Sequence, residues 1–366
     1  MPGALTGGPS GGHMPRSQGV KTIEWLGDRV RFVDQTRLPG ELAFKETGDY
    51  RVVAEAIARL EVRGAPAIGV AAALGVALAA NESPAGDATA LGREVETAAR
   101  LLESSRPTAV NLRWAVARMR EAFRRAESSG PVAARAALVT EAVAVLDEDI
   151  ELCRRIGRNG APLVADGDTV LTHCNAGSLA TAGDGTALAV IYSAVEEGKR
   201  VRVFADETRP LLQGARLTAW ELDARGVDVT VLCDGAAASA MALGLVNKVI
   251  VGADRIALNG DVANKVGTLS VAIAAARQGI PFYVAAPYST LDPAIETGDA
   301  IPIEQRSSDE VAVCGGRRIV PEGVRVWNPA FDVTPAGLVT AIVTDRGVFR
   351  APYRTSLPGA LPPTAP

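Results

Sequence analysis

Apolar residues in the first part of the chain follow helical patterns. These patterns cover 49–62, 66–80, 87–104, 107–128 and 132–156, and such spacing places apolar side chains on one face of each helix. Ahead of them, residues 22–39 favour short alternating strands. We therefore predict a mainly helical N-terminal domain with short strands over residues 20–158.

The pattern changes after Gly160. Short β-branched runs follow, each ending in a polar or turn residue and mostly separated by the length of one helix: 168–174, 200–206, 228–234, 248–254 and 281–287. Alternation of this kind is typical of right-handed β-α-β crossovers and a parallel sheet. We therefore predict a Rossmann-like, doubly wound α/β domain over residues 159–350, and we expect the catalytic site there.

Both ends of the chain have the composition of tails. Residues 1–19 contain eleven Gly, Pro or Ser, too few apolar groups to offset the chain entropy lost on folding. We predict a flexible tail there and give His13 no functional role. Residues 351–366 are rich in proline and are predicted to form a loose C-terminal tail.

Charge and cysteine content narrow the functional classes. The 366 residues carry a net charge of −4, which provides no basic field for nucleic acid. The four cysteines are scattered without a C-x-x-C pair, so we expect reduced thiols in a cytoplasmic protein. The uncharged run 64–80 is short for a membrane span, so we interpret it as a buried helix and expect no membrane partner.

Polar residues at the ends of the predicted strands mark the place to look for a site. Ligands of open α/β sheets bind beyond the carboxyl ends of the strands, and these ends carry Cys174, Asp206, Glu207, Asp234 and Asp254. Each Asp could equally be a helix cap. Cys174 could equally be a small buried hydrophobic residue.

Several cations and amides lie where an anion could bind. Arg63 precedes the Ala-rich helix in RGAP and Arg106 precedes another helical run, so both could hold a phosphate at a helix N-terminus. Asn264 and Lys265 come just before an apolar helical run, and Gln213 and Arg216 lie in a loop that enters a helix. The alternative for each is an ordinary loop contact; together they suggest a phosphate.

The sequence gives little support to nicotinamide, metal-dependent or thiol-protease chemistry. The G-x-G-x-x-G fingerprint is absent, which disfavours a nicotinamide enzyme. His173 is the only histidine outside the tail, and without a Cys/His cluster we expect no metal and no cofactor. His173 adjoins Cys174, and neighbouring strand residues face opposite sides, so a thiol protease is disfavoured. A thiol, a carboxyl and phosphate-binding groups suit an isomerase that relocates hydrogen on a small phosphorylated molecule.

The chain also resembles the methylthioribose-1-phosphate isomerase family. The resemblance rests on RGAPAIGVAAALGVALAA, SRPTAVNLRW, THCNAGSLAT, DETRPLLQGARLTAWEL, GADRIALNGDVANKVGT, PFYVAAPYST, IPIEQRSSDEV and NPAFDVTPAGLVTAIVT, and it runs from about residue 20 to 350. It implies interconversion of 5-methylthioribose 1-phosphate and 5-methylthioribulose 1-phosphate in methionine salvage, by a homodimer without a cofactor. It also implies catalysis by Cys174 and Asp254 and substrate contacts from Arg63, Gly64, Ala65, Arg106, Gln213, Asn264 and Lys265.

One departure from the family pattern concerns substrate preference. Asp184 stands in GDGTA where the family usually has an aromatic residue; if this position flanks the substrate, 5-deoxyribose 1-phosphate or a more polar sugar phosphate could be accepted. Related proteins widen the alternatives to ribose 1,5-bisphosphate isomerases and to non-catalytic regulatory subunits of the eukaryotic initiation-factor exchange complex. Proton transfer and hydride shift both remain open as routes for the hydrogen.

Overall fold

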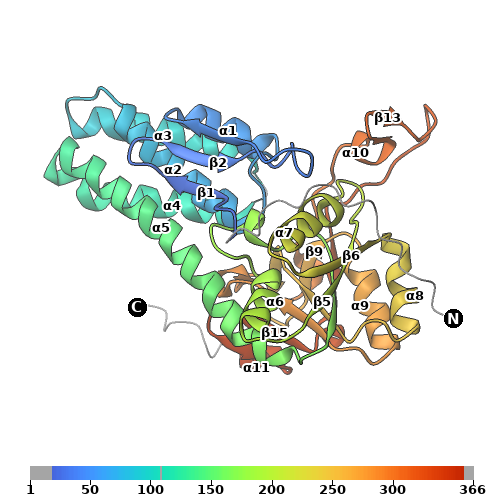
Figure 1. Cartoon of the computed structure of the whole chain (residues 1–366). Coiled ribbons are helices and arrows are strands. Elements are labelled where there is room, and N and C mark those ends of the chain that lie inside the picture. Colours follow the sequence, from blue (N-terminus) through green and yellow to red (C-terminus); the bar gives the residue numbers. More distant parts are fainter. Residues whose placement is uncertain (1–18, 108, 358–366) are drawn as a thin grey trace.

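A computed structural model describes residues 19–107 and 109–357, and its N-terminal half is a layer of helices with a small sheet packed on it (Figure 1). The helix patterns of the sequence fall on helices whose ends differ by a few residues from those predicted. The elements of this half are β1 (Ile23–Trp25), β2 (Val30–Val33), β3 (Phe44–Thr47), α1 (Tyr50–Ala58), α2 (Ala65–Glu82), α3 (Ala88–Ser105), α4 (Val110–Ala126) and α5 (Pro131–Gly160).

Helix α2 is the centre of the helical layer. Every residue from Ala67 to Ala80 is buried, and α1, α3, α4 and α5 pack around it. Pro66 lies in its first turn and Gly64 precedes it. By length and composition alone α2 could also cross a membrane, but 78% of it is buried inside the protein. It is the buried core helix that the sequence predicts.

A seven-stranded sheet forms the second half, and every described pairing in it is parallel except that of β15 with β16. This confirms the predicted α/β class. The strand order is β16-β15-β10-β7-β4-β5-β6, with bounds β4 (Thr169–Thr172), β5 (Arg202–Asp206), β6 (Asp228–Leu232), β7 (Lys248–Val251), β10 (Phe282–Ala285), β15 (Ala341–Thr344) and β16 (Gly347–Phe349).

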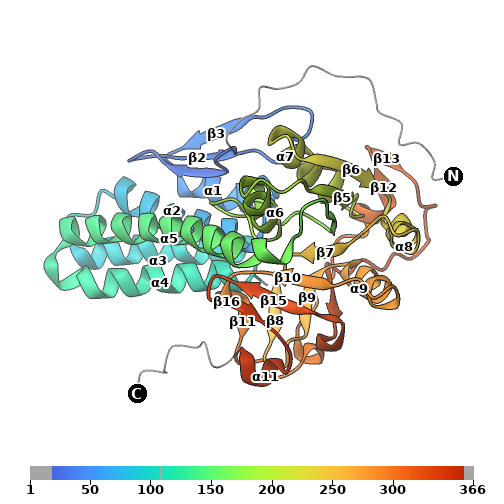
Figure 2. The same ribbon diagram turned by 60° about the horizontal axis from the view of Figure 1, so that its bottom comes forward.

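The strand order reverses direction between β4 and β7. The chain enters the sheet at β4, builds outward through β5 and β6, then returns to the other side of β4 for β7, β10 and β15. Apolar residues alternate between the two faces: Val170 packs with α5, α6 (Ala187–Glu196) and α7 (Ala219–Ala224), and Leu171 with α8 (Ala237–Ala242) and α9 (Thr268–Arg277). Figure 2 shows helices on both faces of the sheet. A doubly wound sheet binds ligands at such a reversal.

A second sheet was not predicted from the sequence. It has the order β11-β8-β9-β14, with β8 (Arg255–Ala257), β9 (Val262–Lys265), β11 (Leu291–Asp292) and β14 (Phe331–Thr334). Asn264 and Lys265 therefore lie at the end of a strand, and they come just before α9, as the sequence predicts. The pairing of β9 with β14 joins segments far apart in sequence, such as Asn264 and Asp332, and no local pattern announces it.

The last elements include a projecting hairpin and a short C-terminal helix. A hairpin of α10 (Asp309–Ala312), β12 (Val313–Cys314) and β13 (Arg317–Arg318) stands out from the body in Figure 1. Helix α11 (Tyr353–Ser356) falls inside the predicted loose tail. That prediction is wrong for 351–357, because Tyr353 and Leu357 are buried and the Tyr353 hydroxyl donates to the Val339 carbonyl. The predicted tail residues 1–18 and 358–366 lie outside the described residues.

Helix α5 joins the two halves. It packs against α2 and α4 and further along against α6, and it runs through the predicted domain boundary between residues 158 and 159. Where α5 meets α6, Gly157 lies against the backbone of α6: a Cβ there would approach the Ala189 carbonyl oxygen to 2.9 Å and overlap the Ser193 hydroxyl.

We predict that Gly157→Ala lowers the free energy of unfolding by about 1–3 kcal/mol, the usual effect of overpacking. Urea unfolding followed by circular dichroism measures this. Gly235→Ala is the matched control, because its new Cβ would meet no described atom within 4 Å. Equal stability of the two variants would contradict the tight α5–α6 contact.

Asp149 makes stability depend on pH. Its carboxylate is buried in α5 and accepts the Ala182 N–H at 2.6 Å, and burial raises its pKa to about 6. The folded protein therefore holds this proton to a higher pH than the unfolded chain does, so ionisation of Asp149 destabilises the fold as pH rises from about 4 through about 6.

We expect the unfolding free energy of wild type relative to Asp149→Asn to fall by roughly 3 kcal/mol between about pH 4 and about pH 7. The amide keeps an acceptor for Ala182 and cannot ionise. Urea unfolding of both proteins at several pH values measures the difference. A difference independent of pH would mean that Asp149 ionises as readily in the folded as in the unfolded protein.

Candidate active site

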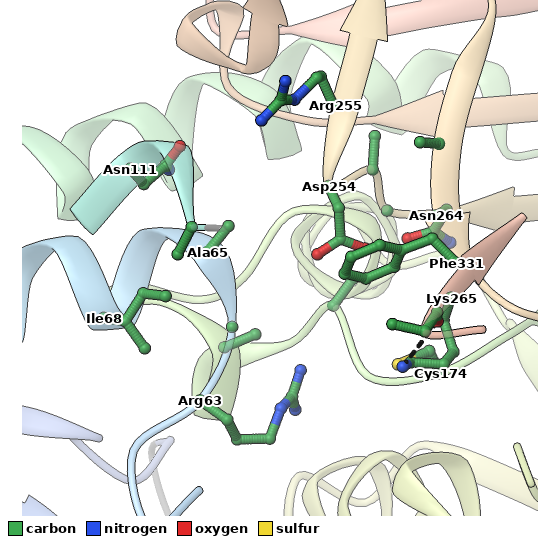
Figure 3. A pocket seen from close by; sticks show the side chains of 18 of the residues that line it. Arg63, Ala65, Ile68, Asn111, Cys174, Asp254, Arg255, Asn264, Lys265 and Phe331 are labelled. Carbon is green, nitrogen blue, oxygen red and sulfur yellow. Dashed lines mark hydrogen bonds between the residues drawn. The ribbon is translucent and has the colours of Figure 1, made fainter. Parts of the chain in front are cut away.

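A cavity of about 160 Å³ opens beyond the carboxyl ends of β4 and β7, between the sheet and the helical layer (Figure 3). The residues implied by the family resemblance come from six separate segments of sequence. All of them line this one cavity: Arg63, Gly64, Ala65, Arg106, Cys174, Gln213, Asp254, Asn264 and Lys265. These residues are spread over about 200 positions of the sequence, and the tertiary fold brings them to one cavity.

Cys174 lies two residues beyond the end of β4 and is half-buried. Its backbone has a φ of 64°, the left-handed region, which is uncommon for a residue with a side chain. Burial raises the pKa of its thiol, and the nearby Arg63 and Lys265 lower it by less. A cation alone would favour the thiolate; here desolvation outweighs the cations.

Asp254 follows β7, the strand beside β4, and its carboxyl faces the same cavity as Cys174. Burial raises the pKa of this carboxyl as well, against the opposing effect of Lys265, Arg63 and Arg106. Burial therefore favours the protonated acid, which can donate a proton.

Arg63 is held in place by a chain of buried polar groups. Its guanidinium donates to the side-chain oxygen of Asn175 at 2.5 Å and to the Asn175 carbonyl at 2.9 Å. The Asn175 amide nitrogen in turn donates to the buried carboxylate of Glu221, which also accepts the N–H of Ser178 at 2.7 Å. These bonds fix which end of the amide faces Arg63, and so they fix the direction of the guanidinium.

Two more cations border the cavity. The Lys265 ammonium donates to the Ala330 carbonyl at 2.9 Å and lies 5.2 Å from the centre of the Phe331 ring. Arg106 ends α3 and pairs with Glu304 at 3.5 Å. Because Glu304 belongs to the second half of the chain, this pair bridges the helical layer and the sheet across the cavity.

Neutral donors and acceptors complete the lining. Gln213 is buried, and its side-chain oxygen has no hydrogen-bond partner among the described residues. Asn264 is buried and donates to the Thr268 hydroxyl at 3.0 Å. Gly64, at a φ of 93°, begins α2 directly against Ala180, where a Cβ would lie 2.6 Å from the Ala180 Cα. Only glycine fits at this entry to α2.

Three of the five strand-end residues do not line the cavity: Asp206, Glu207 and Asp234. The Asp206 carboxylate lies 2.9 Å from Nδ1 of His173, whose Nε2 donates to the Val266 carbonyl. The Asp234 carboxylate accepts the backbone N–H groups of Thr208 and Arg209. His173, Asp206 and Asp234 are close enough to form a metal-ligand group, but both ring nitrogens of His173 are already hydrogen-bonded.

Two other residues singled out in the sequence also lie outside the cavity lining. The Arg216 guanidinium donates to the carbonyls of Gln35 and Leu38. Asp184 pairs with Arg225, whose guanidinium stacks on Tyr192 at 3.9 Å from the ring centre. The structure therefore gives no support to the idea that Asp184 flanks the substrate.

Sequence reasoning missed several residues of the site. His173, Asn175, Glu304, Arg306 and Phe331 also line the cavity. Asn175 follows Cys174 directly in sequence and could have been noted from that neighbourhood. Phe331 reaches the cavity only because β14 pairs with β9, which sets Phe331 opposite Lys265. Glu304 and Arg306 depend on the path of the loop after β11, for which the sequence offers no periodic signal.

Comparison with known proteins identifies the family to which this chain belongs. The model of the initiation factor 2 subunit family matches residues 61–351. A methylthioribose-1-phosphate isomerase of Geobacter sulfurreducens is 54% identical over 343 residues, covering 94% of this chain and 99% of that protein. A 5-deoxyribose 1-phosphate isomerase of Moorella thermoacetica is 53% identical over 338 residues, covering 92% of this chain and 96% of that protein.

Two solved structures have the same fold over nearly their whole length. The 5-methylthioribose 1-phosphate isomerase of Pyrococcus horikoshii OT3 is 43% identical with a TM-score of 0.90, over 94% of this chain and 96% of that one. A protein described as translation initiation factor eIF-2B subunit delta from A. fulgidus is 46% identical with a TM-score of 0.85, over 93% of this chain and 98% of that one. The chain belongs to the initiation factor 2 subunit family and, within it, to the methylthioribose-1-phosphate isomerases.

Proposed function

We propose that the protein interconverts 5-methylthioribose 1-phosphate and 5-methylthioribulose 1-phosphate, an aldose–ketose isomerisation in methionine salvage. The observation that carries the proposal is the placement of Cys174 and Asp254 on adjacent strands at one cavity, with Arg63, Arg106 and Lys265 around them. A thiol and a carboxyl serve proton transfer, and the three cations suit a phosphorylated substrate.

Substrate binding falls to the residues around the acid and the thiol. Arg63, Arg106 and Lys265 would hold the phosphate, and the N-terminus of α2 at Gly64 and Ala65 adds free N–H groups for its oxygens. Gln213 and Asn264 would bind sugar hydroxyls, since the Gln213 oxygen accepts no hydrogen bond from any residue that the structure describes. Each of these roles is a proposal from position and chemistry.

Ring opening is the first chemical demand. An aldose with phosphate on C1 is an acetal and does not open as a free sugar does. Asp254 would donate its proton to the ring oxygen while the bond between C1 and that oxygen breaks, leaving the positive charge shared between C1 and the phosphate-bearing oxygen. The raised pKa of Asp254 supports this role, because the carboxyl then keeps its proton closer to neutral pH.

Hydrogen then moves from C2 to C1 by one of two routes. In a hydride shift the C2 hydrogen carries its electron pair to C1, and the C2 hydroxyl returns a proton to the Asp254 carboxylate. In proton transfer the Cys174 thiolate removes the C2 proton, and the electron pair left behind forms the C1=C2 double bond of an enol. The Cys174 thiol then gives a proton to C1 while the C2 hydroxyl returns its proton to the Asp254 carboxylate, which leaves the ketone at C2. Deuterium taken up from solvent at C1 of the ketose would establish proton transfer, because a thiol proton can exchange with water, whereas a hydride shift takes up none.

The alternatives make different demands on the cavity. A second phosphate, as in ribose 1,5-bisphosphate, would need further cations, but Arg255 is paired with Asp292 and Arg306 with Glu304 and Glu310. Arg106 is paired with Glu304 in the same way, so the choice of a monophosphate, either the methylthio or the 5-deoxy sugar, follows from the names of the relatives. A regulatory subunit would bind ligand without turnover. Assay of purified protein with all three sugars distinguishes these cases.

We further propose that the protein is a cytoplasmic homodimer. Edge strand β6 and the segment after it expose apolar side chains, with Val231 44% and Leu243 70% exposed, and a second copy would cover them. The reduced cysteines that the sequence predicts fit a cytoplasmic location. Light scattering that gives a monomer mass at micromolar concentration would contradict the dimer.

We predict that Cys174→Ala and Asp254→Asn each lower kcat by about 10²–10⁴, the range of general acid–base contributions. In the proton-transfer route one step needs both groups, and the double variant should then be scarcely slower than the worse single variant. The measurement is kcat by coupled detection of the ketose, with product binding by calorimetry as the test of folding.

Cys233→Ala is the matched control, since Cys233 also follows a strand of the sheet but lies outside the cavity lining. It should retain wild-type kcat. Turnover near the wild-type level in either active-site variant would refute the role of that residue, and multiplication of the two defects would place them in separate steps.

A further inference from the structure

The backbone of Cys174 is bonded on both sides to buried threonine hydroxyls. Its N–H donates to Oγ1 of Thr208 at 2.8 Å, and its carbonyl accepts from Oγ1 of Thr218 at 2.7 Å. Both threonines are fully buried, at 0% exposure. A residue with a side chain occupies the left-handed region at a cost, and it stays there where surrounding contacts fix it. The two hydroxyls are such contacts.

Each of the two hydroxyls uses its single proton and accepts one further hydrogen bond. A hydroxyl carries one donor and can accept as well. That of Thr208 accepts from Cys174 and donates to the Asp206 carbonyl at 2.9 Å. That of Thr218 donates to the Cys174 carbonyl and accepts from the Asn175 side chain at 3.2 Å. Removal of either hydroxyl would leave a buried backbone group of Cys174 without its partner.

Thr208 is itself held by the next strand of the sheet. It too has a positive φ, 65°, which is rare for a β-branched residue. The Asp234 carboxylate, after β6, accepts the N–H of Thr208 and of Arg209, both at 2.8 Å. Hydrogen bonds therefore run across the ends of three adjacent strands, from Asp234 after β6 through Thr208 after β5 to Cys174 after β4.

Thr218 approaches from a different element. It ends the π-helical turn Gly214–Thr218 that leads into α7, a helical form often found at functional sites. One turn further along, Glu221 binds Asn175 and Ser178. The same helical segment thus fixes both the carbonyl of Cys174 and the amide that orients Arg63.

We propose that Thr208 and Thr218 are positioning residues that hold Cys174 in the left-handed conformation and so direct its thiol into the cavity beside Asp254. Asp234 supports Thr208 from behind. This role accounts for Thr208 after β5 and Asp234 after β6. Both are polar residues that lie outside the cavity lining. The proposal rests on the proposed role of Cys174 in catalysis.

The test compares valine with serine at each position. Thr208→Val and Thr218→Val keep the shape of the side chain and remove the hydroxyl, whereas Thr208→Ser and Thr218→Ser keep the hydroxyl. We expect each valine variant to lower kcat by about 10- to 100-fold, since a displacement of about 1 Å in a reacting group can cost that much. KM should change less than threefold, and the serine variants should stay within about threefold of wild type.

Thr334→Val is the matched control. Thr334 is equally buried, at 0% exposure, and its hydroxyl has no hydrogen-bond partner among the described residues. This variant should keep wild-type kcat. A comparable loss in Thr334→Val would show that any buried threonine-to-valine change disturbs the protein, and it would overturn the specific role of Thr208 and Thr218.

A second readout does not depend on isomerase activity. Alkylation of Cys174 by iodoacetamide, followed by mass spectrometry of its peptide, reports how the thiol is presented to the cavity. We expect the rate to fall at least fivefold in the valine variants and to stay unchanged in the serine variants and in Thr334→Val. If wild type shows no turnover on any of the three sugars, the proposed function fails, and the alkylation rates still decide the positioning role.

Either of two results overturns the proposal. One is a valine variant with wild-type kcat and wild-type alkylation; the other is a serine variant as impaired as its valine counterpart, because the hydroxyl would then not be the group that matters. Circular dichroism checks the folding of each variant. Should Thr208→Val not fold, Thr218→Val and Thr218→Ser make the same comparison from the carbonyl side of Cys174.

Discussion

The parallel pairing of β4 with β7 is the constraint on which the site depends. Val170 pairs with Lys248 and Leu171 with Val249, and this register carries the chain from both strands to the same edge of the sheet. Cys174 and Asp254 are 80 positions apart in sequence and become neighbours only through it. The reversal of strand order at this pair leaves the loops diverging to opposite sides, which opens the space that the ligand needs.

Burial competes with charge throughout this space. Burial raises the pKa of both the Cys174 thiol and the Asp254 carboxyl, while the cations around them act in the other direction. An acid that keeps its proton suits ring opening. A thiol that keeps its proton is a poor base in the resting protein. The proton-transfer route therefore requires Cys174 to ionise against the effect of burial, and the hydride shift has no such requirement.

Several groups that line this site are held in place by hydrogen bonds from neighbouring residues. The guanidinium of Arg63 is directed by Asn175 and Glu221, and the backbone of Cys174 is bonded to two threonines. Gly177 permits the first arrangement, because a Cβ at that position would overlap the Glu221 carboxylate. Glu221, Thr208 and Thr218 lie outside the cavity lining, yet they set the direction of groups that line it.

Local pattern determined much of this protein. Periodicity located α1 to α5 and the strands β4, β5, β6, β7 and β10, because side-chain alternation is a property of each segment alone. Motif resemblance indicated nine of the residues that line the cavity. Pairing between distant segments was beyond such reasoning: the β9–β14 ladder moved Asn264 and Lys265 onto a strand and brought Phe331 beside them.

The tertiary structure also decided what each polar strand end does. In the sequence Asp206, Asp234 and Asp254 are equivalent, each an acid after a β-branched run. In the fold Asp254 faces the cavity, Asp206 pairs with His173, and Asp234 holds the backbone of Thr208. Their chemistry is the same, so only the path of the surrounding chain could separate their roles. The sequence by itself determined which reactive groups are present. Packing determined which of them face the cavity, because burial and hydrogen-bond partners come from neighbours that the sequence does not place side by side.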